Sequence, residues 1–178
     1  MFEQLASTPA DLLLLGDSLT DRGEWHELLG RPVANRGIAG DTIAGATARL
    51  APIDAQHPKT IAIMLGINDL LSGRSATECA ARYTQLLAAV KRFAPPPRII
   101  VQSVLPVGHD VGLANDVIRQ LNDQLRASCA THGCEYIDLV PAFAAPDGAL
   151  QPALTSDGVH LTGAGYRRWA ELLSATLR

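Results

Sequence analysis

The sequence has few aromatic residues, few cysteines, no excess of basic residues and no long apolar run. Aromatic residues make up 4% of the 178 positions, so no platform for stacking sugars is evident. The formal net charge of -3 argues against a nucleic-acid partner. No apolar run approaches the ~18 residues that a helix needs to span a bilayer. These absences leave a globular chain whose expected partner is a small molecule.

The three cysteines are an odd number and lack the spacing of a metal site. We expect reduced thiols in a cytoplasmic protein, with Cys129 buried and Cys134 at a strand edge. The segment 1–9 has no basic flank and few large apolar residues, so we do not expect a signal peptide. His57 and His132 are isolated from other ligand-type side chains, so no metal site is predicted.

The length and the apolar pattern predict one α/β domain over residues 1–178. Short apolar segments are typical of buried parallel strands, and helical patterns separate them along the chain. This alternation predicts a three-layer α/β/α domain joined by right-handed crossovers. Five strands fit the flavodoxin-like order 2-1-3-4-5. The expected strands are 12–15, 33–35, 60–65, 99–105 and 136–139.

Helix signals lie between these strands. Ser75 and Glu78 have the spacing of a capping box, and the prolines at 95–97 end the helix that follows. A second long helix is expected before Gly133, and the last helix begins near Thr162, a plausible N-cap. Shorter helices are expected over 24–29 and over 43–50, the second of them ended by Pro52.

The connection between Val140 and Leu161 departs from this pattern. It spans roughly twenty residues, contains three prolines and shows no clear helix or strand signal. Connections of this length without secondary structure are uncommon in compact domains, and they are usually functional or disordered. Because this one ends in Ser-Asp-Gly-Val-His at 156–160, we expect it to take part in function.

The order 2-1-3 would bring together, at one edge of the sheet, the loops that carry Ser18, Gly40 and Asn68. A serine hydroxyl needs a base, and the base needs an orienting group. We predict Ser18 as the nucleophile, His160 as the base and Asp157 as its partner. The developing oxyanion needs fixed donors. The backbone N–H groups of Ser18 and Gly40 and the side-chain amide of Asn68 are the predicted donors.

Each motif alone also has an ordinary structural explanation. Gly-Asp-Ser at 16–18, Gly-Ile-Asn-Asp at 66–69 and Asp-Gly at 157–158 are common turn sequences. A single histidine is more often a satisfied core or surface residue than a base. The combination of all the motifs, each after a strand or before the last helix, favours catalysis.

Several neighbouring residues have two equally good interpretations. Asp17 and Asp69 flank the predicted nucleophile and amide donor, where they brace the two loops or simply form turns. Arg22, Trp25 and Val107 either line the substrate pocket or have a purely structural role.

Four sequence blocks resemble the GDSL, or SGNH, family of serine hydrolases. They are Gly-Asp-Ser-Leu at 16–19, Asn-Arg-Gly-Ile-Ala-Gly-Asp-Thr at 35–42, Gly-Ile-Asn-Asp at 66–69 and Asp-Gly-Val-His at 157–160. The last block, before an Ala-Gly-Tyr helix, is most similar to the platelet-activating-factor acetylhydrolase-like branch. The resemblance implies hydrolysis of esters or thioesters through an acyl-enzyme, without metal or cofactor, on a flavodoxin-like sheet.

The sequence therefore predicts a serine esterase that acts on short acyl or acetyl groups. An acyl-thioesterase and a carbohydrate O-acetylesterase would use the same machinery and stay open. An alternative of another class is a non-catalytic flavodoxin-like domain that binds a nucleotide, although neither Gly-x-Gly-x-x-Gly nor a P-loop lysine is present. The chain is expected to be a monomer or a homodimer.

Overall fold

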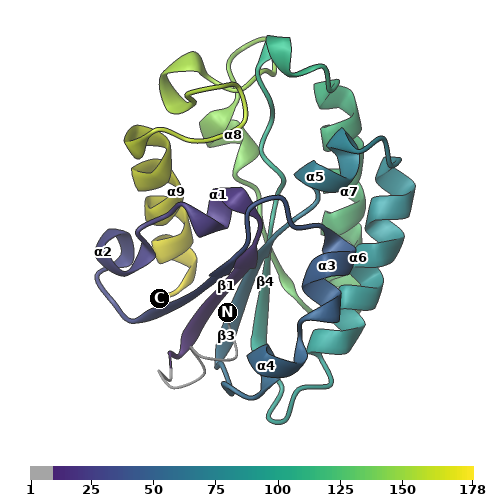
Figure 1. The fold of residues 1–178 in the computed structure, drawn as a ribbon, viewed down its shortest axis with the longest axis vertical. Helices are drawn as coiled ribbons and strands as arrows, with labels where there is room; N and C mark the ends of the chain where they lie inside the picture. The colour runs from purple at the N-terminus through teal and green to yellow at the C-terminus, as the bar shows by residue number, and fades with distance from the viewer. Residues whose placement is uncertain (1–9) are drawn as a thin grey trace.

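A parallel five-stranded sheet forms the centre of the computed structural model, which describes residues 10–178 (Figure 1). All neighbouring strands are parallel, in the order β2-β1-β3-β4-β5, which confirms the predicted fold class and strand order. The segment 1–9, for which no signal peptide is expected, lies outside the described residues. The strands are β1 (Leu12–Gly16), β2 (Val33–Gly37), β3 (Thr60–Met64), β4 (Arg98–Gln102) and β5 (Glu135–Ile137).

The run of four leucines in β1 is explained by burial on both faces of the sheet. Side chains alternate across a strand, so every second leucine points to the same layer. Leu13 and Leu15 pack into the core on one face, and Leu12 and Leu14 pack into a second core on the other. All four are at most 2% exposed. A central strand of a parallel sheet therefore reads as a continuous apolar run.

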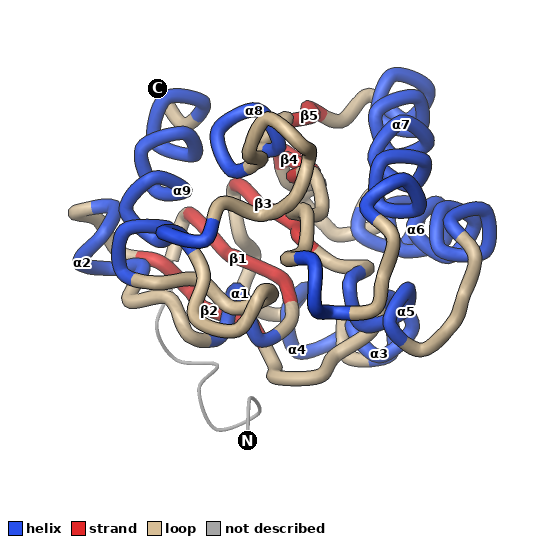
Figure 2. Tube along the Cα trace, turned by 90° about the horizontal axis from the view of Figure 1, so that it is seen from above, coloured by secondary structure: helices blue, strands red, loops and turns tan. Residues whose placement is uncertain are grey.

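Helices cover both faces of the sheet (Figures 1 and 2). One core is shared with α3 (Ile43–Ala48), α4 (Ala51–Asp54), α5 (Ile67–Leu71), α6 (Ala76–Val90) and α7 (Asn115–His132). The other is shared with α1 (Ser18–Asp21), α2 (Trp25–Leu29), α8 (Val140–Phe143) and α9 (Gly163–Thr176). None of the helices within residues 10–178 has the length and apolar character needed to cross a membrane.

The two predicted helix starts are confirmed. Ser75 accepts a hydrogen bond from the Glu78 N–H at 3.3 Å, and the Ser75 N–H donates to the Glu78 carboxylate at 2.9 Å, which completes the capping box before α6. Thr162 accepts from the Gly165 N–H at 3.4 Å and caps α9. At the C-terminal end of α7, Gly133 adopts the left-handed conformation that commonly ends a helix.

Other boundaries differ from the sequence prediction. The helix expected over 43–50 ends at Ala48, and Pro52 lies in the first turn of the separate helix α4. A proline is compatible with a first turn because its missing N–H has no intrahelical acceptor there. The turns expected after β1 and β3 are the short helices α1 and α5.

The connection after Val140 has more structure than its sequence suggests. It contains α8, the 3₁₀ turn η3 (Pro152–Leu154) and two antiparallel bridges, one joining Ala144 to Leu150 and one joining Thr155 to Leu161. Phe143 and Leu154 are buried in the core shared with α9. The prediction of a structureless segment was wrong because these short elements depend on contacts with other parts of the chain.

Candidate active site

The carboxyl ends of β2, β1 and β3 lie level at one edge of the sheet. Gly16 at the end of β1 is paired with Gly37 of β2 and with Met64 of β3. Ser18 in α1, Gly40 in the turn after β2 and Asn68 in α5 follow these three strands. The structure thus places three segments that lie far apart in the sequence at one edge of the sheet, which is seen from above in Figure 2.

Ser18 is placed by a sharp strand-to-helix turn. Asp17 caps α1 by accepting a hydrogen bond from the Leu19 N–H at 3.0 Å, so Ser18 is the first residue of the helix. A Cβ on Gly16 would lie 2.0 Å from the Thr20 hydroxyl oxygen and 2.9 Å from the Met64 carbonyl oxygen. Only glycine allows this approach. The Ser18 side chain is left at the end of β1, with the residue 7% exposed.

A hydrogen-bonded chain joins Ser18 to two residues near the C-terminus. The Ser18 Oγ lies 3.0 Å from the His160 Nε2, across 142 positions of sequence. The His160 Nδ1 lies 2.6 Å from the Asp157 Oδ2, and the His160 N–H donates to the Asp157 Oδ1 at 2.7 Å. The side chain of His160 is 22% exposed, so the imidazole is reachable from solvent.

The negative charge of Asp157 determines which nitrogen of His160 carries the ring proton. The hydrogen bond from the His160 ring lowers the pKa of Asp157 to about 2, and the backbone N–H groups of His160 and Val159 act in the same direction. A carboxylate can only accept, so the ring proton lies on the Nδ1 of His160. The Nε2 then presents its lone pair to the Ser18 hydroxyl. This tautomer is the one that a base for Ser18 requires.

Hydrogen bonds to backbone groups hold the loop that carries His160 in place. The Thr155 hydroxyl donates to the His160 carbonyl at 2.8 Å and accepts from the Gly158 N–H at 2.9 Å. The Gly158 carbonyl accepts from the Gly108 N–H at 2.8 Å, which joins this loop to the one after β4. The imidazole is therefore oriented before any substrate binds.

Gly40 and Asn68 are the other two residues predicted to supply oxyanion donors, and they lie in the segments after β2 and β3. Gly40 has a φ of +78°, in the left-handed region that favours glycine. The Asn68 amide donates one hydrogen to the Asp41 carbonyl at 2.8 Å. A primary amide has two N–H donors, so this bond orients the side chain and leaves the second N–H for another acceptor.

Two buried carboxyl groups lie beneath these loops. Asp17 and Asp69 are both 0% exposed. Asp69 accepts from the Ile43 N–H at 2.9 Å and so ties α5 to the start of α3. Burial, helped by the nearby charges of Asp41 and Asp69, raises the pKa of Asp17 to about 7, although the hydrogen bond from the Leu19 N–H acts in the opposite direction. Both carboxyls accept hydrogen bonds from backbone N–H groups, as the bracing role requires, and the alternative was a simple turn role.

Three residues, for which a pocket-lining role and a purely structural role were both open, have different positions. Arg22 is exposed at the end of α1. Trp25 is 2% exposed, and its indole ring lies edge-on to Trp169 with centroids 4.6 Å apart. Val107 is 1% exposed. The structure places Trp25 and Val107 in the core and not on accessible surface, because each packs against neighbouring elements that sequence alone does not show.

Sequence reasoning missed two asparagines of α7 that hold the loop after β4. The Asn122 side chain bonds both the N–H and the carbonyl of Val104, and Asn115 does the same for Val107. Asn122 is 5% exposed. Asn122 could have been found from the sequence, because it is a polar residue on the apolar stripe of a helix. A buried amide at such a position needs hydrogen-bond partners.

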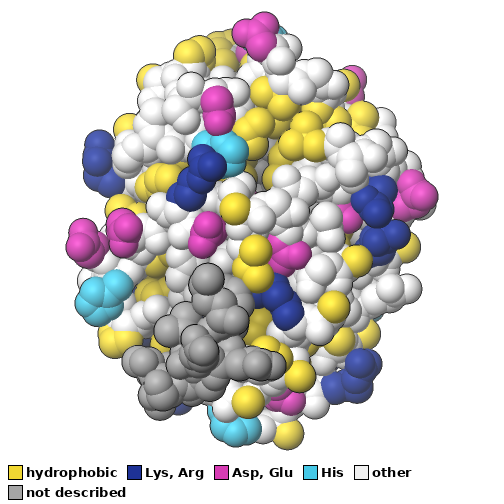
Figure 3. Space-filling view, viewed as in Figure 1, with side chains coloured by type: hydrophobic (Ala, Val, Ile, Leu, Met, Phe, Trp, Pro, Cys, Tyr) yellow, Lys and Arg dark blue, Asp and Glu magenta, His cyan; other side chains and the backbone are white. Residues whose placement is uncertain are grey.

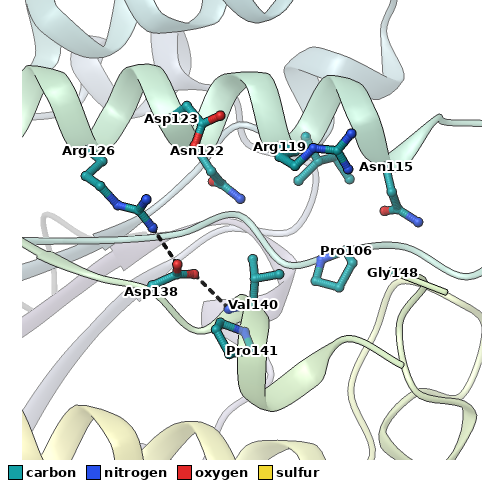
Figure 4. Close-up of a pocket in the computed structure, with 11 residues that line it drawn as sticks. Pro106, Asn115, Arg119, Asn122, Asp123, Arg126, Asp138, Val140, Pro141 and Gly148 are labelled. Carbon is teal, nitrogen blue, oxygen red and sulfur yellow. Dashed lines mark hydrogen bonds and ion pairs between the residues drawn. The ribbon is translucent and has the colours of Figure 1, made fainter. Parts of the chain in front are cut away.

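Figure 4 shows these asparagines along one wall of a cavity of about 280 Å³ between α7 and the segment around Val140. Arg126 and Asp138 form an ion pair across it. Neither Ser18 nor His160 lines this cavity.

In the space-filling view, hydrophobic side chains gather on the upper part of the molecule, toward the end of the sheet that carries the loops (Figure 3).

Comparison with known proteins identifies the family. The model of the GDSL-like lipase/acylhydrolase family matches residues 14–168. The chain belongs to this family. Members are hydrolases, and this chain is a GDSL-type ester hydrolase. Within residues 10–178, no group of three or more His, Cys, Asp or Glu side chains is arranged to hold a metal ion.

Relatives of this GDSL-type hydrolase cover most of its length. Human platelet-activating factor acetylhydrolase IB subunit alpha1 is 28% identical over 164 residues, which is 88% of this chain and 70% of the relative. A GDSL-like lipase structure from Bacteroides thetaiotaomicron has a TM-score of 0.82 at 20% identity, covering 98% of this chain and 93% of its own. A mutant acetyl-xylooligosaccharide esterase from Geobacillus Stearmophilus has a TM-score of 0.75 at 24% identity, covering 91% of both chains. The two structures share the fold.

The raised pKa of Asp17 predicts a pH dependence of stability. Between about pH 4 and pH 7 the folded protein keeps a proton that the unfolded chain has released, so the free energy of unfolding falls as pH rises. Asp17→Asn keeps the acceptor for the Leu19 N–H and removes the titration. We expect the wild type to lose roughly 2–4 kcal/mol across this window relative to the Asn variant in denaturant titrations. Asp21→Asn, on the exposed side of the same helix, is the control, and equal slopes in wild type and Asp17→Asn would contradict the assignment.

Proposed function

We propose that this hydrolase cleaves carboxylic esters of short acyl groups through an acyl-enzyme on Ser18. The observation that carries the proposal is the hydrogen-bonded chain from the Ser18 Oγ through His160 to Asp157, with distances of 3.0 Å and 2.6 Å. A serine needs such a base, oriented by a third group, to become a nucleophile.

In the first step, the Nε2 of His160 accepts the Ser18 proton while the Oγ attacks the ester carbonyl carbon. The carbonyl oxygen becomes an oxyanion and binds the Ser18 and Gly40 N–H groups and the free N–H of Asn68. Asp157, held as a carboxylate, stabilises the imidazolium that forms. The carbon–oxygen bond to the alcohol then breaks, and the alcohol leaves with the proton from His160.

In the second step, water replaces the alcohol. His160 accepts a proton from the water as its oxygen attacks the acyl carbon, and the same donors bind the second oxyanion. The bond to the Ser18 Oγ breaks, and the oxygen of Ser18 recovers its proton from His160. The products are a carboxylic acid and the free enzyme. Each proton that leaves one group arrives at a named partner, so no cofactor is needed.

The names of the relatives support a short acyl group. The human relative is an acetylhydrolase, and the Geobacillus protein is an acetyl-xylooligosaccharide esterase. An acyl-thioester or an acetyl group on a carbohydrate would pass through the same two steps, so these substrates are the alternatives within the class. The family match favours all three over a non-catalytic domain that binds a nucleotide.

The first test is hydrolysis of p-nitrophenyl esters from acetate to laurate. We expect the wild type to prefer the shortest esters and Ser18→Ala to lose the activity, because the acyl-enzyme cannot form. Ser174→Ala, on α9, should behave like the wild type. Equal activity in wild type and Ser18→Ala would refute the proposed nucleophile, and a preference for laurate would refute the short acyl group.

Removal of the amide donor should slow the chemical step. In Asn68→Ala we expect kcat to fall roughly 10²–10³-fold with little change in KM, because the donor acts on charge that develops only in the transition state. Ser72→Ala, at the end of the same helix, is the matched control. Steady-state kinetics with p-nitrophenyl acetate measure both constants. An unchanged kcat in Asn68→Ala would exclude this residue from the oxyanion site.

The proposed base predicts the direction of the pH profile. His160 must be neutral to accept the Ser18 proton, so kcat/KM should rise as the pH increases above 5. Asp157 does not cause the acid limb, because its pKa of about 2 keeps it ionised over this range. The increase of kcat/KM with pH should persist in Asp17→Asn, which would show that the titration of Asp17 does not cause it. A flat profile from pH 5 to pH 9 would contradict the role of His160.

A further inference from the structure

Arg49 lies directly after α3 and points back beneath the loops of the site. Its side chain is only 17% exposed. Because arginine is rarely buried without partners, its contacts are informative. It is not part of the hydrogen-bonded chain of Ser18, and no step of the proposed reaction uses it. Its contacts nevertheless reach the segments that carry the predicted oxyanion donors.

The guanidinium of Arg49 bonds three separate segments. Its Nε donates to the Asp41 Oδ2 at 2.8 Å, in an ion pair whose carboxylate is 10% exposed. Its Nη2 donates to the Gly16 carbonyl at 3.2 Å and to the Arg36 carbonyl at 2.9 Å. The acceptors belong to the end of β1, to β2 and to the loop after β2.

Two of the three acceptors lie close to a predicted donor in sequence, and one of these two also accepts a hydrogen bond from the third donor. Gly16 is two positions before Ser18, and Asp41 directly follows Gly40. The Asp41 carbonyl accepts the hydrogen bond that orients the Asn68 amide, at 2.8 Å. One side chain is thus connected, through bonds of 2.8–3.2 Å, to the backbone beside all three predicted donors.

We propose that Arg49 is the positioning residue that sets the spacing of the three oxyanion donors. The proposal rests on the proposed function, because it assigns the donors that the ester oxyanion would use. Arg49 touches no substrate in this scheme. It acts through Asp41 and through the two carbonyl groups.

The chemistry of the side chain explains why an arginine stands here. A guanidinium has donors that point in fixed directions within one plane, so one group can hold a carboxylate and two carbonyls at once. A lysine ammonium on a flexible stem does not fix these directions. Misplacement of a catalytic group by about 1 Å can cost on the order of 10²-fold in rate. A loosened loop should therefore lower kcat more than it weakens substrate binding.

Arg36 provides a matched control within the same region. It is 6% exposed and lies in β2, so it is at least as buried as Arg49. Its guanidinium donates to the Gln56 side chain at 2.6 Å and to the Asn35 carbonyl at 2.9 Å. Gln56 lies after α4 and Asn35 lies within β2, so these two partners are outside the segments that carry the donors. A buried arginine that serves only the fold should behave like Arg36.

The experiment compares Arg49→Ala, Arg49→Lys and Arg36→Ala with p-nitrophenyl acetate. We expect kcat to fall roughly 10–10²-fold in both Arg49 variants, with KM within about twofold of the wild type. Added guanidinium chloride at millimolar concentration should restore part of the lost kcat in Arg49→Ala, and methylammonium should not. Arg36→Ala should lower the Tm by at least as much as Arg49→Ala, while its kcat stays within about twofold of the wild type.

Amide hydrogen exchange supplies a readout that does not depend on turnover. Exchange at residues 38–42 should accelerate in both Arg49 variants and not in Arg36→Ala. Unchanged exchange there, or a kcat loss in Arg36→Ala equal to that in Arg49→Ala, would overturn the proposal. If the wild type hydrolyses no ester, or Ser18→Ala keeps the activity, the proposed function fails, and exchange at 38–42 still decides whether Arg49 holds this loop.

Discussion

Three neighbouring parallel strands that end at the same level are the constraint on which the site depends. The pairing of Gly16 with Gly37 on one side and with Met64 on the other places three loops at one edge of the sheet. Ligands of open α/β sheets bind at this edge, at the point where the strand order reverses direction. Here that point lies between β1 and β3, and the residues that follow β1 are Asp17 and Ser18. Both faces of β1 are buried, so its four leucines hold the strand between the two cores.

The loops are held by polar contacts that the apolar cores do not provide. Asp69 ties the loop after β3 to the start of α3, and Arg49 ties the loop after β2 to the end of β1. Asn122 does the same for the loop after β4, which in turn contacts the segment that carries His160. Buried groups of this kind are costly unless each is paired, so they specify one arrangement of the loops. The imidazole and the predicted donors are consequently oriented without substrate.

Much of the fold followed from local patterns. Four consecutive leucines, the capping box at Ser75 and the glycine after α7 mark elements whose cause lies in adjacent residues. Local patterns failed where the cause lies elsewhere in the chain. The short helices α1 and α5 were expected to be turns, and the segment after Val140 was expected to have no structure. Trp25 lies against Trp169, 144 positions later, which no window of sequence around it reveals.

The sequence by itself determined which chemistry is available: a serine after a buried strand, a glycine and an asparagine after two others, and Asp157 three positions before His160. These features are local, because residue type and spacing along a strand or turn suffice to recognise them. The tertiary structure alone decided the distances, such as the 3.0 Å between the Ser18 Oγ and the His160 Nε2. It also decided which polar side chains hold the loops, since Arg49 and Asn122 become meaningful only when parallel pairing and helix packing bring distant backbone groups within reach of them.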